Sequence, residues 1–471
     1  MCEVAPMLSN LTFYLPVILA FAIVVRSTGS PVSADVLFVT FNSIALLGTA
    51  IMVNAENEVE RTYFWVVFSL TVTAVIVIGA LRLAWPKHPG PLRSAAITPA
   101  SAGLLMLYGF AAFVSVGYFA AVGHITLVEA FRSTGPYDAA TARLESYAGT
   151  TYFFPGYVNQ FKNAVLPIVT TALVHHMFVK RMPGRWPVSL AMGAFAFVMV
   201  AGTGQRGAMV LSVLVLLSGL LLGRVLRGRI LVGSLAAFFG LFALQTVVLQ
   251  RQAADLAGTS GPLGQVLVFI EALWSRVVLE NPQSGIAGFH YTETLPTAWG
   301  SEWVADLRGL LPGQRGSDLS NKIFETLYGS TRGTSPPSIW GDLHYNFGLV
   351  GSFVMTVLIA VAMVWVGFVT IATLRKDPSV TLLRVLAASG AAVTAGSWIA
   401  GSPVSLLNQG FLAYLAIFIL EPRISGRHEP KTRRVRAARP AVRRVARAAR
   451  AARPSTPAGG SHDPTDSLSG V

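Results

Sequence analysis

Two polar segments of the chain hold side chains that could act on a phosphate-linked substrate. The first, AGTGQRGAMVL, places Arg206 between two closely spaced apolar runs. The planar fork of its guanidinium suits a pair of phosphate oxygens. Three glycines beside it would let a ligand approach the backbone closely; they are Gly202, Gly204 and Gly207. The same pattern also fits a tight turn whose arginine extends its charged end to the membrane surface.

The second segment, RGTSPPSIWGDLHYNFGLVGSF, holds Asp342, His344 and Tyr345 directly before a long apolar run. A carboxylate or an imidazole is what a general base requires. We therefore predict that Asp342 or His344 is catalytic and that Tyr345 contacts the substrate. The alternative is an ordinary solvated loop, part of which caps the helix that follows.

Four further charged residues in the polar connections are candidates for substrate binding. Arg315 and Arg332 precede the second segment, and Arg143 and Glu145 lie in an earlier connection. Arginine and aromatic residues together suit phosphate and sugar contacts, although the combination is also common on any wet loop. The chain contains one cysteine, Cys2, and no HExxH, CxxC or Walker motif, so we expect neither a metal ion nor a cofactor.

The elements that carry these segments are predicted to be membrane helices. Of the 471 residues, 53% are hydrophobic and only 12% are charged, whereas soluble domains carry about 25% charged residues. The apolar runs reach the roughly 20 residues that a helix needs to cross a bilayer, and they lack the strict alternation of barrel strands. We predict an all-α integral membrane protein with about eleven transmembrane helices (ten to twelve), at residues 7–25, 34–53, 62–84, 101–123, 162–179, 187–204, 207–223, 230–250, 349–373, 379–400 and 404–420.

Lysine and arginine determine the predicted orientation. Every second connection is basic, as the positive-inside rule requires of cytoplasmic loops. This places the C-terminus inside and the two long connections, 124–161 and 251–348, outside the cytoplasmic membrane. Within the longer one, residues 263–279 predict an interfacial or re-entrant helix. Residues 1–420 would form the membrane domain, and 421–471 a basic, disordered tail.

The net charge of +14 lies mostly in this tail. A basic Ala/Arg segment after the last span favours anionic lipid head groups as its partner, and we expect no nucleic acid. The alternative is a topology anchor without a specific partner.

Two motifs resemble those of the O-antigen polymerase (oligosaccharide repeat-unit polymerase) family. One is the small-polar-x-Arg-Gly turn between adjacent spans, here GTGQRGAMVL. The other leaves the large outer loop for the next helix, here GTSPPSIWGDLHYNFGLVG. The layout of spans, with a medium and then a larger outer loop, is similar as well. Members of the family often have Glu and Tyr where this chain has Asp342 and His344-Tyr345.

The resemblance implies polymerisation of oligosaccharide repeat units that are carried on polyprenyl diphosphate, at the outer face of the cytoplasmic membrane. This lipid-linked oligosaccharide would be the main partner, with a chain-length regulator as a further one. Arg206 would stabilise the departing diphosphate, and Asp342 or His344 would deprotonate the acceptor hydroxyl. Substrate contacts are expected from Arg315, Arg332, Arg143, Glu145 and Tyr345.

Three other functions fit a similar layout. A related ligase would move a finished glycan onto a different acceptor. A mannosyl- or arabinosyltransferase would carry paired acidic residues in its first outer loop, but Glu56, Glu58 and Glu60 include no adjacent pair. A secondary transporter or flippase would keep ionisable residues in mid-membrane, and the predicted spans have no Asp or Glu at their centres.

Overall fold

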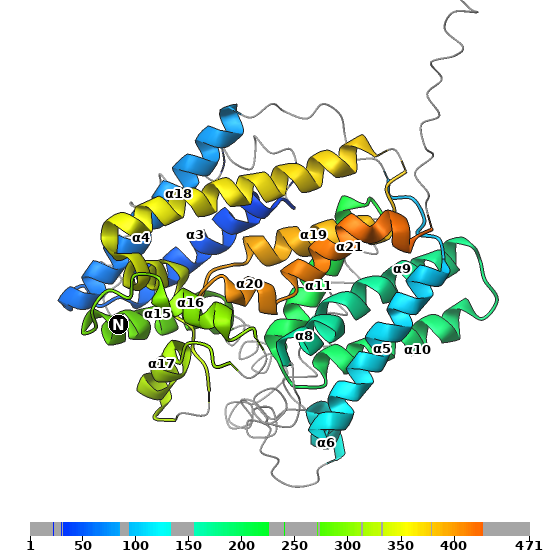
Figure 1. Ribbon diagram of the computed structural model, residues 1–471, viewed down its shortest axis with the longest axis horizontal. Coiled ribbons are helices and arrows are strands. Elements are labelled where there is room, and N and C mark those ends of the chain that lie inside the picture. Colours follow the sequence, from blue (N-terminus) through cyan, green and yellow to red (C-terminus); the bar gives the residue numbers. More distant parts are fainter. Residues whose placement is uncertain are drawn as a thin grey trace, which may run out of the picture. The chain divides into compact units, whose positions relative to one another are not determined.

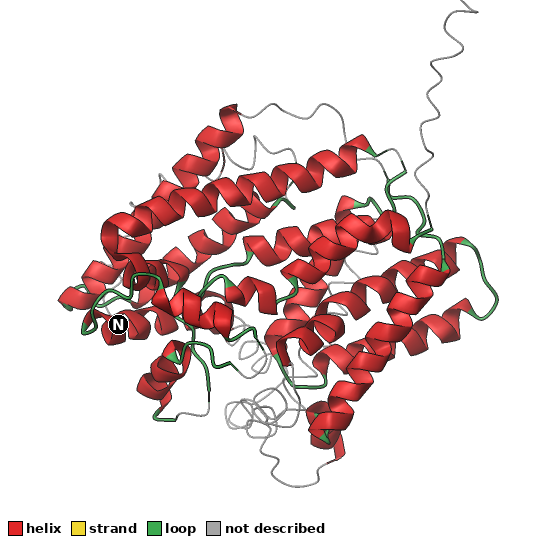
Figure 2. Ribbon diagram, in the orientation of Figure 1, coloured by secondary structure: helices red, strands yellow, loops and turns green. Residues whose placement is uncertain are grey.

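The computed structural model describes residues 32–84, 94–132, 155–225, 274–311, 314–330, 333–377 and 379–426, with single positions 22, 30, 240 and 271. The chain divides into two compact units, Met1–Gly426 and Arg427–Val471, and all elements below belong to the first. The described part is helical (Figure 2), apart from isolated β-bridges of Ala96 with Thr381 and of Ser338 with Ala400. The spans predicted at 7–25 and 230–250 and the tail beyond Gly426 lie outside the described residues.

Four of the described helices are long and apolar enough to cross a membrane: α3 (Ala34–Met52), α4 (Glu58–Ala84), α5 (Ala102–Val122) and α18 (Ile339–Lys376). Three shorter apolar helices are α10 (Arg185–Ala201), α11 (Arg206–Leu222) and α19 (Leu382–Gly396). Their surfaces expose large apolar side chains: Phe113, Leu190 and Val350 are 74%, 75% and 78% exposed. Apolar surface on this scale suits contact with lipid rather than water, so these helices indicate a multi-pass membrane protein.

Shorter elements complete the described part. They are α6 (Thr126–Arg132), α8 (Pro155–Gln160), the π-helical turn η1 (Phe161–Val165), α9 (Leu166–Val179), the π-helical turn η2 (Ser275–Leu279), α15 (Glu280–Glu293), α16 (Ser301–Arg308), α17 (Leu319–Tyr328), α20 (Val404–Asn408) and α21 (Phe411–Ile424). The span predicted at 162–179 therefore corresponds to η1 and α9. The long connection 251–348, predicted with one interfacial helix, carries η2, α15, α16 and α17.

Two helices differ in extent from the predicted spans. α18 begins at Ile339, well before the predicted start at 349, because the Ser338 side chain caps it by accepting a backbone N–H from its first turn. The helix then breaks at Gly348 (φ 62°, ψ −176°), a conformation open essentially to glycine alone. The apolar span follows this break, and residues 339–347 form a separate helical segment before it. The span predicted at 404–420 is divided into α20 and α21 at Gly410 (φ 95°).

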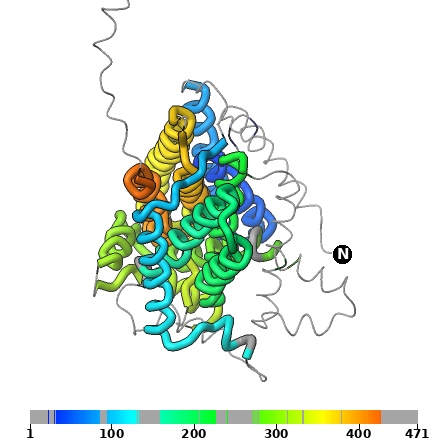
Figure 3. Tube along the Cα trace, turned by 90° about the vertical axis from the view of Figure 1, so that its right-hand side faces the viewer, coloured from blue at the N-terminus to red at the C-terminus, as the bar shows by residue number. Residues whose placement is uncertain are grey.

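α19 is buried along its whole length and joins two packed groups of helices. Its sequence, LLRVLAASGAAVTAG, is rich in small residues, which let neighbouring helix backbones approach closely. It packs with α9, α11 and α21 of one group and with α3 and α18 of the other. Gly390 lies against the ring of Tyr414, and Gly396 lies against Leu37 at the start of α3. In the second group α18 runs along α4, as two views show (Figures 1 and 3).

A buried ion pair joins the start of α3 to the end of α4. The Arg82 guanidinium donates to both carboxylate oxygens of Asp35, with Nη2 2.7 Å from Oδ1. The Ser33 hydroxyl donates to the same carboxylate at 2.6 Å. The Asp35 side chain is fully buried and that of Arg82 is 11% exposed. Gly367 of α18 covers the pair so closely that a Cβ there would lie 2.6 Å from Asp35 Oδ1, so three helices depend on this contact.

Candidate functional site

Asp342 lies in the first turn of α18 and is only 3% exposed. Trp303 of α16 donates from its indole Nε1 to Asp342 Oδ2, and Asn346 donates from Nδ2 to Oδ1 at 3.3 Å. The Trp303 ring packs edge-on against Phe347, with ring centroids 5.1 Å apart, and lies 6.5 Å from the ring of Trp398. The carboxyl group is therefore held in one orientation by donors on two elements.

Burial raises the pKa of Asp342 from 3.8 to about 7. The hydrogen bond from Trp303 lowers this pKa, whereas the nearby carboxylates of Asp306 and Glu302 raise it, because like charges disfavour ionisation. Residues 339–347 precede the apolar span of α18, so this group lies outside the membrane-spanning part of the helix. A carboxyl that titrates near neutral pH can take a proton from a substrate hydroxyl and release it again.

Asp306 and Glu302, the two acidic neighbours of Asp342, lie on α16 and make polar contacts of their own. Asp306 accepts the backbone N–H of Ser317 at 3.0 Å and the hydroxyl of Ser402. The Ser317 hydroxyl in turn donates to Glu302. Arg315, one of the predicted substrate-binding residues, is exposed and lies just before Ser317 on the same connection. The Arg315 guanidinium therefore lies on the loop whose Ser317 contacts Asp306 and Glu302, the acidic neighbours of Asp342.

The structure separates Asp342 from His344. Residues two positions apart in a helix are rotated by about 200° about its axis, so their side chains point to nearly opposite sides. His344 packs against Phe289 of α15, with ring centroids 5.3 Å apart, whereas Asp342 faces Trp303. Burial lowers the pKa of His344, which favours the neutral imidazole. The two side chains therefore face different neighbours and do not form one acid–base pair.

Tyr345 points into a third environment. It packs against a small apolar cluster formed by Ala287 of α15 and by Leu319 and Ile323 of α17. Its backbone carbonyl accepts the N–H of Ala298 at 2.9 Å. Burial raises the pKa of its hydroxyl, so the phenol stays protonated at neutral pH. Tyr345 therefore attaches α18 to α15 and α17.

The predicted turn between α10 and α11 is present. α10 ends at Ala201, Gly204 adopts a positive φ of 72°, and Arg206 is the first residue of α11. The Gly204 N–H donates to the Ala201 carbonyl at 2.8 Å. Thr203 is fully buried, and its hydroxyl has no hydrogen-bond partner among the described residues. The Arg206 side chain itself lies outside the part that the structure describes.

α11 and α19 run antiparallel. Gly219 lies against Leu386, and further along the pair the Ser389 hydroxyl donates to the Val215 carbonyl at 3.2 Å. Positions earlier in α11 thus pair with positions later in α19. The start of α11, with Arg206, therefore lies at the end of the bundle where α19 stops.

The start of α18 lies at this same end. α19 stops at Gly396, and the chain continues to Ala400, which forms a β-bridge with Ser338 immediately before α18. Asp342 follows one turn later. Helix packing therefore brings the two predicted site segments to one end of the bundle, although they are far apart in sequence.

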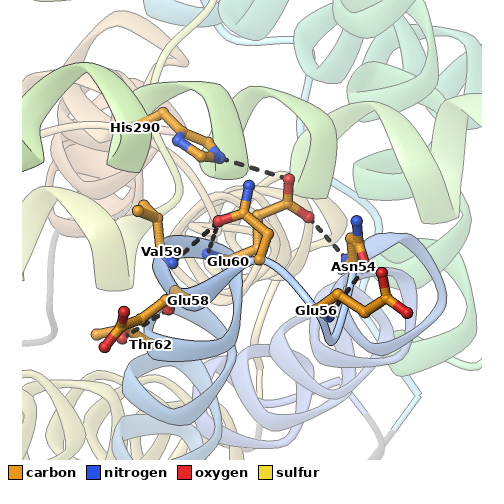
Figure 4. A network of polar contacts seen from close by, with 8 residues as sticks. Asn54, Glu56, Glu58, Val59, Glu60, Thr62 and His290 are labelled. Carbon is orange, nitrogen blue, oxygen red and sulfur yellow. Dashed lines mark hydrogen bonds and ion pairs between the residues drawn. The ribbon is translucent and has the colours of Figure 1, made fainter.

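A polar network joins the α3–α4 link to α15 (Figure 4). Glu60 of α4 accepts the backbone N–H of Asn54 at 2.7 Å, and its other oxygen lies 3.4 Å from Nε2 of His290 on α15. Tyr63, also on α4, donates its hydroxyl to Ser338 Oγ at 2.7 Å. The network holds α15 and the start of α18 against the α3–α4 hairpin.

Sequence reasoning missed three buried charged residues, Asp35, Lys162 and Glu421. Lys162, in η1, is fully buried although it stands at the edge of an apolar run, where lysines usually mark a span boundary. The residues around it, Gln160 and Asn163, are polar as well and were the available signal. Of the other predicted residues, Arg143, Glu145 and Arg332 lie outside the described residues.

The described residues contain no group of three or more His, Cys, Asp or Glu side chains that could hold a metal ion. The described residues form an all-helical fold, and its apolar helices indicate a multi-pass membrane protein. No protein-family model matches the sequence. No curated protein matches it. No solved structure matches the chain.

Proposed function

We propose that the chain is a glycosyltransferase that polymerises polyprenyl-diphosphate-linked oligosaccharide repeat units at the outer face of the cytoplasmic membrane. The observation that carries this proposal is the buried Asp342 carboxyl, whose pKa lies near 7, at the same end of the bundle as the Arg206 turn. A lipid-linked diphosphate presents its reacting bond at the membrane surface. A base and a cation are therefore needed together where the helices end.

In the proposed reaction the Asp342 carboxylate takes the proton of the acceptor hydroxyl while the hydroxyl oxygen attacks the anomeric carbon of the donor. The bond between that carbon and the diphosphate oxygen breaks, and polyprenyl diphosphate leaves. Arg206 stabilises the negative charge that develops on it. Arg315 contacts the substrate from the exposed loop between α16 and α17.

The proposal includes the arrangement of about eleven spans, with the long connections outside and the basic tail on cytoplasmic anionic lipids. The described helices support this orientation, because basic residues lie at the end of the bundle opposite Asp342. Arg82 ends α4, and Arg375 and Lys376 end α18. In this orientation the buried pair of Asp35 and Arg82 lies at the cytoplasmic end.

Replacing Arg206 by Ala is expected to lower polymer synthesis about 100- to 1000-fold, the usual effect of removing one group that stabilises transition-state charge. The measurement is the ladder of repeat lengths made by cells that carry the variant in place of the native gene. Arg185→Ala, at the opposite end of α10, is the matched control and should give a normal ladder. A normal ladder from Arg206→Ala would remove its diphosphate role, and addition of a single glycan block by the native protein would identify a ligase.

Trp303→Phe is expected to move the acid limb of the activity profile to higher pH by roughly one unit. The native limb should lie near pH 7, because Asp342 must lose its proton to act as a base. The indole N–H stabilises the ionised carboxyl, so its removal raises the pKa of Asp342 further. The rate of repeat-unit addition by isolated membranes across neutral pH measures the shift. Trp365→Phe, on the exposed face of α18, should not move the limb; an unmoved limb in Trp303→Phe would exclude Asp342 as the titrating base.

A further inference from the structure

The chain buries a cation that the proposed reaction does not use. Lys162 lies in η1, the π-helical turn between α8 and α9, and is 0% exposed. Single π-helical turns are rare and occur frequently at functional sites. An ammonium group among apolar helices is unfavourable unless it is paired, and intramembrane charges of this kind usually serve a function.

Among the described residues, the charge of Lys162 has no counter-ion. The ammonium donates to Asn163 Oδ1 at 2.7 Å, although it has three N–H donors. The rings of Tyr118 and Phe119 on α5 face it at 5.2 Å and 5.9 Å from their centroids, which offsets part of the unfavourable burial. No carboxylate of the described residues lies within ion-pair distance of it.

Lys162 is a neighbour of the turn that carries Arg206. Gly202, in that turn, packs against Phe119 so closely that a Cβ would lie 2.7 Å from the ring Cζ, and Lys162 lies over the same ring. The next residue of the turn is Thr203, whose buried hydroxyl is unpartnered within the described part of the chain. Lys162 and Gly202 therefore contact the same ring, Phe119, and Thr203 follows Gly202 directly in the chain.

We infer that Lys162 is a second cation for the diphosphate of the lipid-linked substrate, together with the Thr203 hydroxyl and Arg206. The inference rests on the proposed function and extends it to a residue that the sequence motifs do not contain. A diphosphate has two phosphoryl groups to neutralise. Arginine supplies a planar fork and lysine a compact point charge, so the two cations suit the two groups.

The test is binding of geranylgeranyl diphosphate to the purified full chain in phosphatidylcholine nanodiscs, measured by calorimetry. Lys162→Met keeps the length of the side chain without its charge and should weaken binding roughly tenfold to a hundredfold, as expected for one lost hydrogen bond to a charged group. Lys162→Arg should bind nearly as well as the native chain. Since Met also removes a buried unpaired charge, its melting temperature should be equal or higher, whereas a purely structural lysine would lower it.

Lys180→Met provides the matched control, because Lys180 is exposed at the far end of α9, and its Kd should not change. Native affinity in Lys162→Met, no binding by the native chain, or loss of folding in both Lys162→Met and Lys162→Gln would overturn the inference. So would the loss of geranylgeranyl diphosphate binding when phosphatidylglycerol replaces part of the phosphatidylcholine, which would assign the site to a lipid head group. Asp342→Asn separates the two proposals: normal polymer in that variant rejects the reaction proposed above, whereas the loss of prenyl diphosphate binding in Lys162→Met still supports this site.

Discussion

Asp342→Asn is expected to reduce polymer formation by about 100- to 10000-fold, the range typical of general acid–base catalysis, without unfolding the protein. Asn has the shape of Asp but cannot accept the proton of the acceptor hydroxyl. The indole of Trp303 still finds an oxygen to donate to. Asn346, whose Oδ1 has no partner within the described part of the chain, can rotate its amide to accept an N–H from the new side chain. The initial rate of repeat-unit addition by isolated membranes measures the effect.

Stability separates a chemical role from a structural one in the same variant. Burial raises the pKa of Asp342 from 3.8 to about 7, so ionisation of this group opposes folding. Its contribution to stability is therefore greatest below its unfolded pKa and is lost as the pH rises through the folded pKa. Asn carries no charge, and above pH 7 the variant should melt at the native temperature or higher.

A matched substitution on the opposite side of the helix completes this test. His344→Gln should retain most activity, because His344 faces Phe289 of α15 rather than Trp303. An active Asp342→Asn protein would exclude Asp342 as the base. An inactive His344→Gln protein beside an active Asp342→Asn protein would transfer that role to the imidazole.

Asp35→Asn is expected to lower the free energy of unfolding by about 3–5 kcal/mol, the effect of leaving one partner of a buried ion pair unpaired. Arg82 would keep its charge among α3, α4 and α18 without a carboxylate to accept its N–H groups, and the close approach of Gly367 leaves little room for rearrangement. Denaturant or thermal unfolding of the purified chain in detergent measures the loss.

A double-mutant cycle shows whether the loss comes from the pair. Removing both charges, in Asp35→Asn with Arg82→Met, should recover part of the lost stability, because no uncompensated charge remains buried. The control is Glu325→Gln in α17, which breaks the pair of Lys322 and Glu325, side chains that are 46% and 45% exposed. It should change the unfolding free energy by less than about 1 kcal/mol. Equal losses in Asp35→Asn and Glu325→Gln would contradict the structural role of the buried pair.

Helix positions could be predicted where an apolar run is long and ends in polar residues. α3, α4 and α5 lie within a few residues of 34–53, 62–84 and 101–123, because the width of the bilayer sets the length of such runs. The start of α18 could not be predicted, because Asp342 and Asn346 interrupt the apolar pattern. Their polar groups bond to each other and to Trp303, so the helix continues through them.

The candidate site could be predicted in its residue types but not in its geometry. A carboxylate before a helix and an arginine in a glycine-rich turn are visible in the sequence. The position of His344 relative to Asp342 follows from the helix that contains both, which the sequence reading treated as a loop. The burial of Lys162 and the contact of Trp303 depend on packing between distant elements, η1 on α5 and α16 on α18, which no local pattern encodes.

The break at Gly348 has a consequence for how the protein tolerates different lipids. A membrane helix adapts to a thicker or thinner bilayer by changing its tilt, and a rigid α18 would carry Asp342 along with every such change. The non-helical conformation of Gly348 uncouples the first turns of α18 from the rest of the helix, and the bridge of Ser338 with Ala400 anchors these turns. Hydrophobic mismatch can then be absorbed by residues 349–376 without turning the carboxyl group away from Trp303.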